Sequence, residues 1–188
     1  RYRHSKYDEK KVAEYYPFLS KYYDFDTIPG KPLNFSRRIR PADTFTVKPN
    51  VVLVICESFS AYKSSMHGNP LDATPFFNQL VKNGVYFDHC FTPTYGTARG
   101  VWAVITSIPD VEIANTASRN PAAVDQHTII NDLNGYEKFY FIGGSASWAN
   151  IRGVLTNNIQ NLHLYEEEDF KAGRIDVWGI SDKNLLLE

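Results

Sequence analysis

The chain has 188 residues, enough for one domain with a hydrophobic core of its own. Hydrophobic residues make up 43% and charged residues 22%, a balance typical of globular proteins. The formal net charge of -1 argues against nucleic acid as a partner, because such binding usually shows as a surplus of Lys and Arg. No stretch approaches the roughly 20 apolar residues of a membrane-spanning helix, and no signal peptide is recognisable, so we expect a soluble domain.

Residues 1–49 differ in composition from the remainder and are predicted to be an N-terminal extension or linker. The first 25 residues are polar with scattered tyrosines and are compatible with one short helix. The following stretch carries four prolines and no periodicity, which favours an extended segment. Arg37, Arg38 and Arg40 lie close together, and a solvated surface cluster is favoured over a phosphate site.

From residue 50 to 188 the pattern predicts one α/β domain. Continuous apolar runs are typical of parallel strands that are covered on both faces. Threonine and proline at helix starts, and glycine at helix ends, delimit the helices between them. The predicted order is strand 51–56, helix 75–84, strand 85–91, helix 98–108 with Thr97 as a possible cap, helix 127–135 and strand 138–144. This order implies an open, mostly parallel sheet with helices on both faces.

Several polar or reactive side chains receive no chemical role. Cys56 and Cys90 each lie in an apolar run, so buried free thiols are favoured over a disulfide. His67 and His89 are interpreted as structural or surface histidines rather than ligands. Asp182 is predicted to cap a helix.

Two oxygen-bearing side chains follow predicted strands, where ligands collect in open parallel sheets. Glu57 comes directly after the first strand, and a carboxylate there either binds a hard divalent cation or caps a neighbouring loop. Thr97 comes after the second strand at a predicted helix start. It is either a plain helix cap or a hydroxyl beside a phosphate that the helix N-terminus attracts. A threonine hydroxyl needs a metal or base to become a good nucleophile, and the two residues together would supply that arrangement.

Further features follow Glu57 in a fixed order. The sequence reads TPFFNQLVKNGVYF at 74–87 and TARG at 97–100, followed by an apolar run and Ser-Ile-Pro. Residues 50–188 thereby resemble the sulfatase-like family of the alkaline phosphatase superfamily, and in particular its lipoteichoic acid synthase and phosphoglycerol transferase branch. The resemblance implies an alkaline phosphatase-like fold, Thr97 as nucleophile, and Glu57 and Thr97 as ligands of a divalent cation. Manganese is the first choice for that cation, with magnesium or zinc as alternatives.

The residue at position 97 separates the branches of this superfamily. Sulfatases proper carry a cysteine there in C-x-P-x-R, whereas this chain has Thr97, and Cys90 begins CFTPT. Phosphoethanolamine transferases usually flank the threonine with paired cysteines, and residues 96–103 contain none. Phosphoglycerol transfer is therefore preferred. Phosphoethanolamine transfer, phosphodiester or sulfate ester hydrolysis, and a non-catalytic sulfatase-like module stay open as alternatives.

The sequence GGSASWANIRG at 143–153 resembles the loop in which related synthases place a tryptophan and a nearby basic residue around the glycerophosphate. The resemblance implies Trp148 and Arg152 as substrate-binding residues. The spacing of Arg152 from the tryptophan departs from the synthase pattern, and Trp148 has the alternative of a packed loop aromatic.

The resemblance also implies partners and a location. The family completes its metal site with an Asp-His pair, which is not found after Trp148, so we expect a sheet that is incomplete at the C-terminal side, little activity in this piece alone, and self-association through an exposed edge. The expected partners are a phospholipid donor and a glycan or glycerophosphate acceptor. We further expect an extracytoplasmic location at the bacterial envelope, with a membrane anchor outside this chain.

Overall fold

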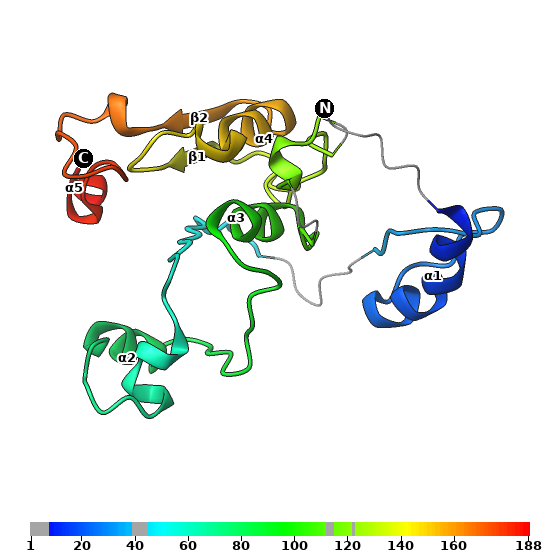
Figure 1. The fold of residues 1–188 in the computed structure, drawn as a ribbon, viewed down its shortest axis with the longest axis horizontal. Coiled ribbons are helices and arrows are strands. Elements are labelled where there is room, and N and C mark those ends of the chain that lie inside the picture. Colours follow the sequence, from blue (N-terminus) through cyan, green and yellow to red (C-terminus); the bar gives the residue numbers. More distant parts are fainter. Residues whose placement is uncertain (1–7, 39–44, 112–114, 122) are drawn as a thin grey trace. The chain divides into compact units, whose positions relative to one another are not determined.

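The computed structural model describes residues 8–38, 45–111, 115–121 and 123–188. The chain divides into two compact units, Arg1–Val54 and Ile55–Glu188, and each is described by itself (Figure 1). Among the described residues, no helix has both the length and the apolar composition needed to cross a bilayer.

The first unit is built on one helix, α1 (Glu9–Tyr23), as the polar N-terminal sequence predicted. The Asp8 side chain caps it by accepting a hydrogen bond from the Lys11 amide at 3.2 Å. The segment after the helix folds back on it, because the Tyr16 hydroxyl donates to the Asn34 carbonyl at 2.7 Å and accepts from the Asn34 amide at 3.0 Å. Of the arginine cluster, Arg37 and Arg38 are exposed, and Arg40 lies outside the described residues.

The second unit mixes helices, short 3₁₀ turns and strands. The helices are α2 (Pro75–Val81), α3 (Thr97–Thr106), α4 (Ile151–Asn158) and α5 (Asp182–Leu187). The strands are β1 (Lys138–Phe141) and β2 (Leu162–Tyr165). The 3₁₀ turns are η1 (Ala61–Lys63), η2 (Ser65–His67), η3 (Ala117–Arg119), η4 (Trp148–Asn150) and η5 (Glu167–Asp169).

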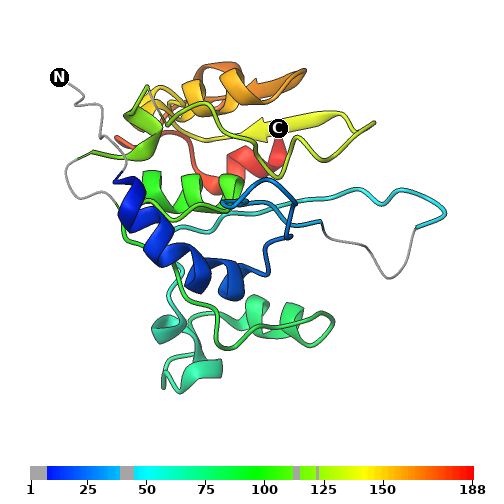
Figure 2. The same ribbon diagram turned by 90° about the vertical axis from the view of Figure 1, so that its right-hand side faces the viewer.

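The two strands form an open parallel sheet, with α4 in the connection between them (Figure 1 and Figure 2). Tyr140 pairs with Leu164 in the register, and both side chains pack against the hydrophobic core. On the other face, aromatic rings stack along the strands, with Phe141 and Tyr165 at 5.1 Å between ring centroids. The predicted α/β class with a parallel sheet is confirmed.

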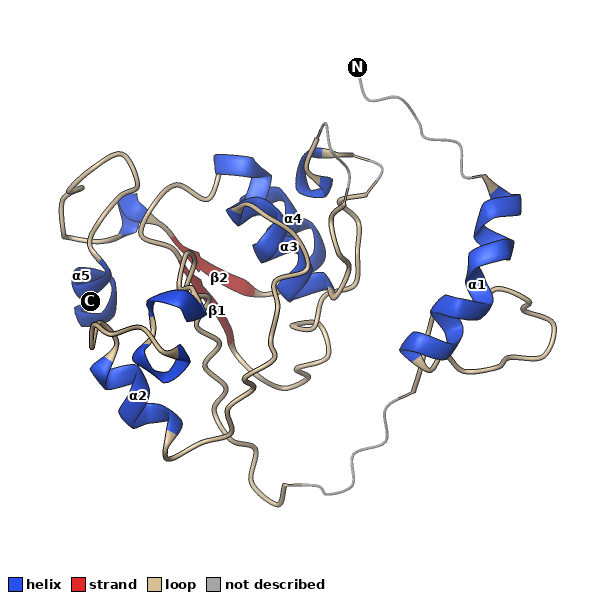
Figure 3. Cartoon of the chain, turned by 60° about the horizontal axis from the view of Figure 1, so that its bottom comes forward, coloured by secondary structure: helices blue, strands red, loops and turns tan. Residues whose placement is uncertain are grey.

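The core of this unit lies between α3 and α4, which Figure 3 shows near the strands. Apolar residues recur at helical spacing on α3, so that one face buries Trp102 and Ile105 while the other meets solvent. Ile105 is 1% exposed, and Leu155 on α4 is fully buried. These two helices form the scaffold on which the candidate site is built.

Two of the predicted strands are wrong. Residues 51–56 and 85–91 have no strand pairing, and most of their apolar side chains are exposed. Parallel strands are stable only when neighbours satisfy their backbone groups on both edges, and neither segment meets such a neighbour among the described residues. The burial predicted for Cys56 and Cys90 is wrong for the same reason: both thiols are free, as predicted, but exposed.

The helix predicted over 127–135 is also wrong, because this segment consists of turns. The side chain of Asn131 accepts from the Thr128 amide at 2.7 Å and from its hydroxyl at 2.6 Å. The amide group of Asn131 donates to the Asn158 carbonyl at 2.7 Å. Such side-chain bonds offer the backbone an alternative to a helix.

The N-cap of α5 is Ser181, whose hydroxyl accepts from the Asn184 amide at 3.2 Å. Asp182 is the first residue of the helix rather than its cap. An acidic side chain there still interacts favourably with the helix dipole.

The helix start at Thr74-Pro75 is confirmed, with Pro75 as first residue of α2. The Thr74 hydroxyl does not cap the helix but donates to Ser64 at 3.1 Å and to Asn78 at 3.2 Å. Asn78 in turn donates to Ser65 at 2.7 Å. This polar network ties α2 to the turns that follow Glu57.

Candidate active site

Thr97 is the first residue of α3 and is partly exposed. The N-cap is Gly96, whose φ of 83° is a conformation that glycine adopts without strain. No side chain caps the helix, so the interpretation of Thr97 as a plain cap is not supported. Thr97 therefore belongs to the first helical turn, whose amides have no acceptor within the helix and favour an anionic group nearby.

A buried ion pair fixes the helix that carries Thr97. Arg99 Nε lies 3.8 Å from Asp110 Oδ2, and the two side chains are 11% and 1% exposed. The Arg99 guanidinium also lies 5.1 Å from the ring centroid of Tyr95, before the nucleophile position. Asp110 Oδ2 accepts a hydrogen bond from the Ala117 amide at 2.8 Å. The carboxylate thus links α3 to the turn η3.

The turn η3 in turn holds the loop that carries Trp148. The buried Ser118 hydroxyl donates to the Ala149 carbonyl at 2.7 Å, and the Asn150 side-chain amide donates to the Ser118 carbonyl at 2.6 Å. Ala149 and Asn150 both have positive φ, at 54° and 59°. Two successive non-glycine residues in this conformation are costly and persist only when their surroundings hold them.

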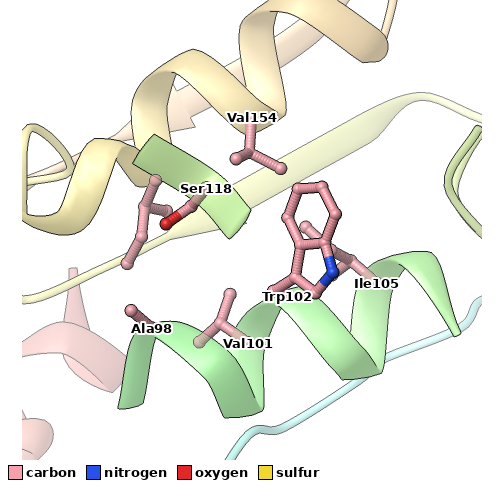
Figure 4. Close-up of a pocket in the computed structure, with 7 residues that line it drawn as sticks. Ala98, Val101, Trp102, Ile105, Ser118 and Val154 are labelled. Carbon is pink, nitrogen blue, oxygen red and sulfur yellow. The ribbon is translucent and has the colours of Figure 1, made fainter. Parts of the chain in front are cut away.

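A small apolar cavity lies between α3, η3 and α4 (Figure 4). Ala98 on α3, Ser118 on η3 and Ile151 at the start of α4 line it together. Ala98 adjoins Thr97, and Ser118 lies within the segment that holds Trp148. The nucleophile candidate and the tryptophan loop therefore belong to one packed assembly.

Trp148, predicted either to bind substrate or to be a packed loop aromatic, is 47% exposed. The guanidinium of Arg119 lies over its ring, 5.9 Å from the centroid.

Arg152, the other predicted substrate-binding residue, forms an ion pair with Glu166 Oε1. Glu166 Oε2 accepts from the Ala146 amide at 2.8 Å. The pair therefore braces the loop between β1 and α4.

Glu57 lies in an exposed turn, followed by Ser58 at a φ of 58°. No hydrogen bond or ion pair joins Glu57 to Thr97 or to any other described residue, so their proximity stays a prediction. A carboxylate and a hydroxyl suit a hard divalent cation, which prefers oxygen ligands. Among the described residues no three His, Cys, Asp or Glu side chains gather to complete such a site.

The two histidines without an assigned role have nearby partners. His67 contacts the Tyr86 hydroxyl, and His89 lies 2.8 Å from the Asp88 carboxylate on the surface.

Sequence reasoning overlooked three residues of this assembly. Arg99 lies within TARG but received no role, and Asp110 and Arg119 lie between two predicted helices, where no element was predicted. The position of Asp110, directly after the proline that follows α3, is the sequence feature from which its role could have been predicted. No local pattern distinguishes Arg119 from a solvated arginine.

A comparison with protein families finds one model, Sulfatase, that matches residues 49–188. The chain belongs to the sulfatase family. This sulfatase-family match covers most of the chain and places it in the alkaline phosphatase/sulfatase superfamily, whose enzymes are of the sulfatase and phosphoesterase type. Members typically use a divalent metal. No curated protein and no solved structure matches the chain.

Proposed function

We propose that this sulfatase-family chain transfers a phosphoglycerol-type group from a lipid donor through a phospho-threonine intermediate on Thr97. The observation that carries the proposal is the position of Thr97: first residue of α3, partly exposed, with its hydroxyl not used as a cap and with the helix held by the Arg99–Asp110 pair. A sulfatase proper would carry a cysteine instead of a threonine at position 97.

The chemistry divides into two displacements. The Thr97 oxygen attacks the phosphorus of the donor, a bond forms to phosphorus, and the bond to the diacylglycerol oxygen breaks. Thr97 loses its hydroxyl proton in this step, and the departing diacylglycerol oxygen takes up one proton. An acceptor hydroxyl then attacks the same phosphorus, so that a bond forms from the acceptor oxygen to phosphorus and the bond from phosphorus to the Thr97 oxygen breaks. The proton that the acceptor hydroxyl loses balances the proton that the Thr97 hydroxyl regains. The amides of the first turn of α3 would orient the anionic phosphate throughout.

Glu57 and Thr97 are the residues that would hold a divalent cation, with manganese as first choice. When bound, such a cation lowers the pKa of a coordinated hydroxyl and offsets the charge of the phosphoryl oxygens. Trp148 and Arg152 border the loop that would receive the head group. A lipid donor also places the reaction at a membrane surface, on the extracytoplasmic side of the envelope.

The test is to trap the intermediate. The full-length protein is mixed with phosphatidylglycerol but no acceptor, digested, and examined by mass spectrometry for a glycerophosphoryl adduct. We expect the adduct on Thr97, none in Thr97→Ala, and partial turnover in Thr97→Ser, because the attacking oxygen remains. Thr94→Ala, in the same loop, is the matched control and keeps wild-type turnover. An adduct on another residue, or wild-type turnover by Thr97→Ala, would refute the nucleophile.

The donor arms of the same experiment address the reaction class. Phosphatidylethanolamine and an aryl sulfate ester replace phosphatidylglycerol in parallel reactions. An adduct formed only from phosphatidylethanolamine would replace phosphoglycerol transfer with phosphoethanolamine transfer. Release of sulfate without any adduct would indicate an ester hydrolase.

A further inference from the structure

We infer that Arg119, rather than Arg152, is the cation that binds the phosphate of the substrate, and that it does so from its position over the Trp148 ring. The inference deepens the proposed function, on which it rests, by naming the residue and the ligand class of the same site. The ligand is a phosphate ester of a small polyol, of the size of glycerol phosphate.

Arg152 is committed elsewhere. Its guanidinium pairs with Glu166, and the second oxygen of that carboxylate holds the Ala146 amide. The backbone amide of Arg152 also donates to the Ala146 carbonyl at 2.7 Å. To bind a phosphate, Arg152 would have to leave a carboxylate that is only 15% exposed, and that carboxylate would lose its counter-charge. These contacts make Arg152 a positioning residue for the loop that carries Trp148.

Arg119 has the opposite surroundings. It is exposed, it lies over the Trp148 ring, and no described carboxylate forms an ion pair with it. The N–H groups of a guanidinium lie in its own plane, so a guanidinium over an aromatic ring can still donate to two oxygens of one phosphate. The cation–π contact with Trp148 also favours this position of the side chain before the ligand arrives, which lowers the entropy cost of binding.

Hydrogen bonds hold together the two backbone segments that carry Arg119 and Trp148. Arg119 directly follows Ser118, whose hydroxyl and carbonyl make the two buried hydrogen bonds to Ala149 and Asn150. Trp148 directly precedes those two residues with positive φ. The strained turn thus holds the ring at a fixed place relative to Arg119, and strain of this kind clusters at binding and active sites.

The link to the nucleophile comes through packing. Ala98 and Ser118 line one cavity, and each adjoins one of the functional residues, Thr97 and Arg119. Asp110 connects the same two segments through Arg99 and the Ala117 amide. A phosphate on Arg119 therefore lies on the assembly that also holds the attacking hydroxyl.

Binding of glycerol 1-phosphate by the full-length protein, followed by titration calorimetry, tests the inference. All variants also carry Thr97→Ala, so that no transfer occurs. We expect Arg119→Gln to weaken binding by about tenfold or more, because a charge-assisted contact is lost, and Arg119→Lys to keep part of the affinity. Trp148→Phe should weaken binding less than Arg119→Gln, since a phenyl ring still supports the guanidinium.

Arg152→Gln and Arg174→Gln are the matched arginine variants. Arg174 is exposed and pairs with Glu167, away from Trp148 in the sequence. Arg174→Gln should change the dissociation constant by less than about threefold. Arg152→Gln should lower the unfolding temperature because Glu166 loses its partner, and it should weaken binding less than Arg119→Gln does. Glycerol itself should not bind measurably, which shows that the phosphate carries the affinity.

The inference is overturned if Arg119→Gln binds within about twofold of the parent while Arg152→Gln loses about tenfold. It is equally overturned if glycerol 1-phosphate does not bind the parent. The outcome is independent of the adduct experiment. Binding that depends on Arg119 without any adduct on Thr97 would sink the proposed function alone, and an adduct on Thr97 with binding insensitive to Arg119 would sink the present inference alone.

Discussion

The Glu57 carboxylate is exposed and forms no hydrogen bond or ion pair with another described side chain, so it is able to coordinate a metal ion. Glu57→Gln removes the charge and keeps the shape of the side chain, so it should reduce both the metal content and the transfer rate. Metal per chain is measured by mass spectrometry of the dialysed full-length protein. Glu137→Gln, another exposed glutamate, is the control and should keep both values. Full metal content and rate in Glu57→Gln would remove Glu57 from the site.

At the residue scale, the sequence allowed Thr97 to be predicted because its neighbours form a specific ordered pattern. The surroundings were not predictable. Arg99 and Asp110 are eleven positions apart, and whether their charges meet depends on how the chain turns after α3. The ion pair of Arg152 with Glu166 likewise joins residues fourteen positions apart, which no local pattern reveals.

Of the residues that connect elements, Asp110 is the one whose substitution should lower the free energy of unfolding most. Asp110→Asn keeps an acceptor for the Ala117 amide but removes the negative charge that lies beside the largely buried Arg99 guanidinium. We expect the free energy of unfolding to fall by about 1–3 kcal/mol. Urea denaturation measures it. Asp88→Asn, in an exposed pair with His89, should change it by less than about 0.5 kcal/mol. Equal effects of both substitutions would contradict a structural role for Asp110.

The strand β1 gives the fold a dependence on pH. Burial against the core raises the pKa of the Tyr140 hydroxyl above its ordinary value of about 10. Below about pH 10 the hydroxyl is protonated in both the folded and the unfolded chain, so its contribution is constant. Above that pH the unfolded chain releases the proton while the folded chain retains it. The free energy of unfolding therefore falls as the pH rises through the raised pKa.

Tyr140→Phe should flatten this fall, because the group that titrates differently in the two states is gone. Unfolding by urea at a series of alkaline pH values measures the slope. Tyr22→Phe, at an exposed position of α1, is the control. An unchanged slope in Tyr140→Phe would show that other groups cause the alkaline loss of stability.

The elements themselves were predicted where local signals agree with the packing. α3 combines a start signal at Thr97, apolar positions at helical spacing and a proline beyond its end, and all three lie within residues 97–109. β1 was found from its apolar run, whereas β2 was missed because His163 interrupts a run of only four residues. The run at 51–56 shows the limit of this reasoning: it indicates which residues need burial, but pairing depends on neighbours that a local pattern does not contain.

On the scale of the whole molecule, exposed apolar surface is the dominant feature. Residues 51–55 form an uncharged, β-branched run without proline, and Val52 and Val54 are 84% and 70% exposed. Segments of this composition pair with other chains when they are accessible. The described strands β1 and β2 make a sheet of only two members, so its outer edges have no further described strand. Self-association of the chain of residues 1–188 follows as an expectation.

Val52→Lys combined with Val54→Lys tests this expectation. Alternate residues of an extended segment lie on one side, so the two lysines place like charges along a single face and oppose pairing with a second copy. In sedimentation velocity, the wild-type chain should show a mass above the monomer that grows with concentration, and the double variant should shift toward the monomer. Leu186→Lys with Leu187→Lys adds the same charge at two exposed leucines of α5 and should leave the association unchanged, because a short helix offers no backbone edge. If both double variants dissociate the protein equally, net charge is the cause, and if the wild type is monomeric at every concentration, the exposed run does not pair.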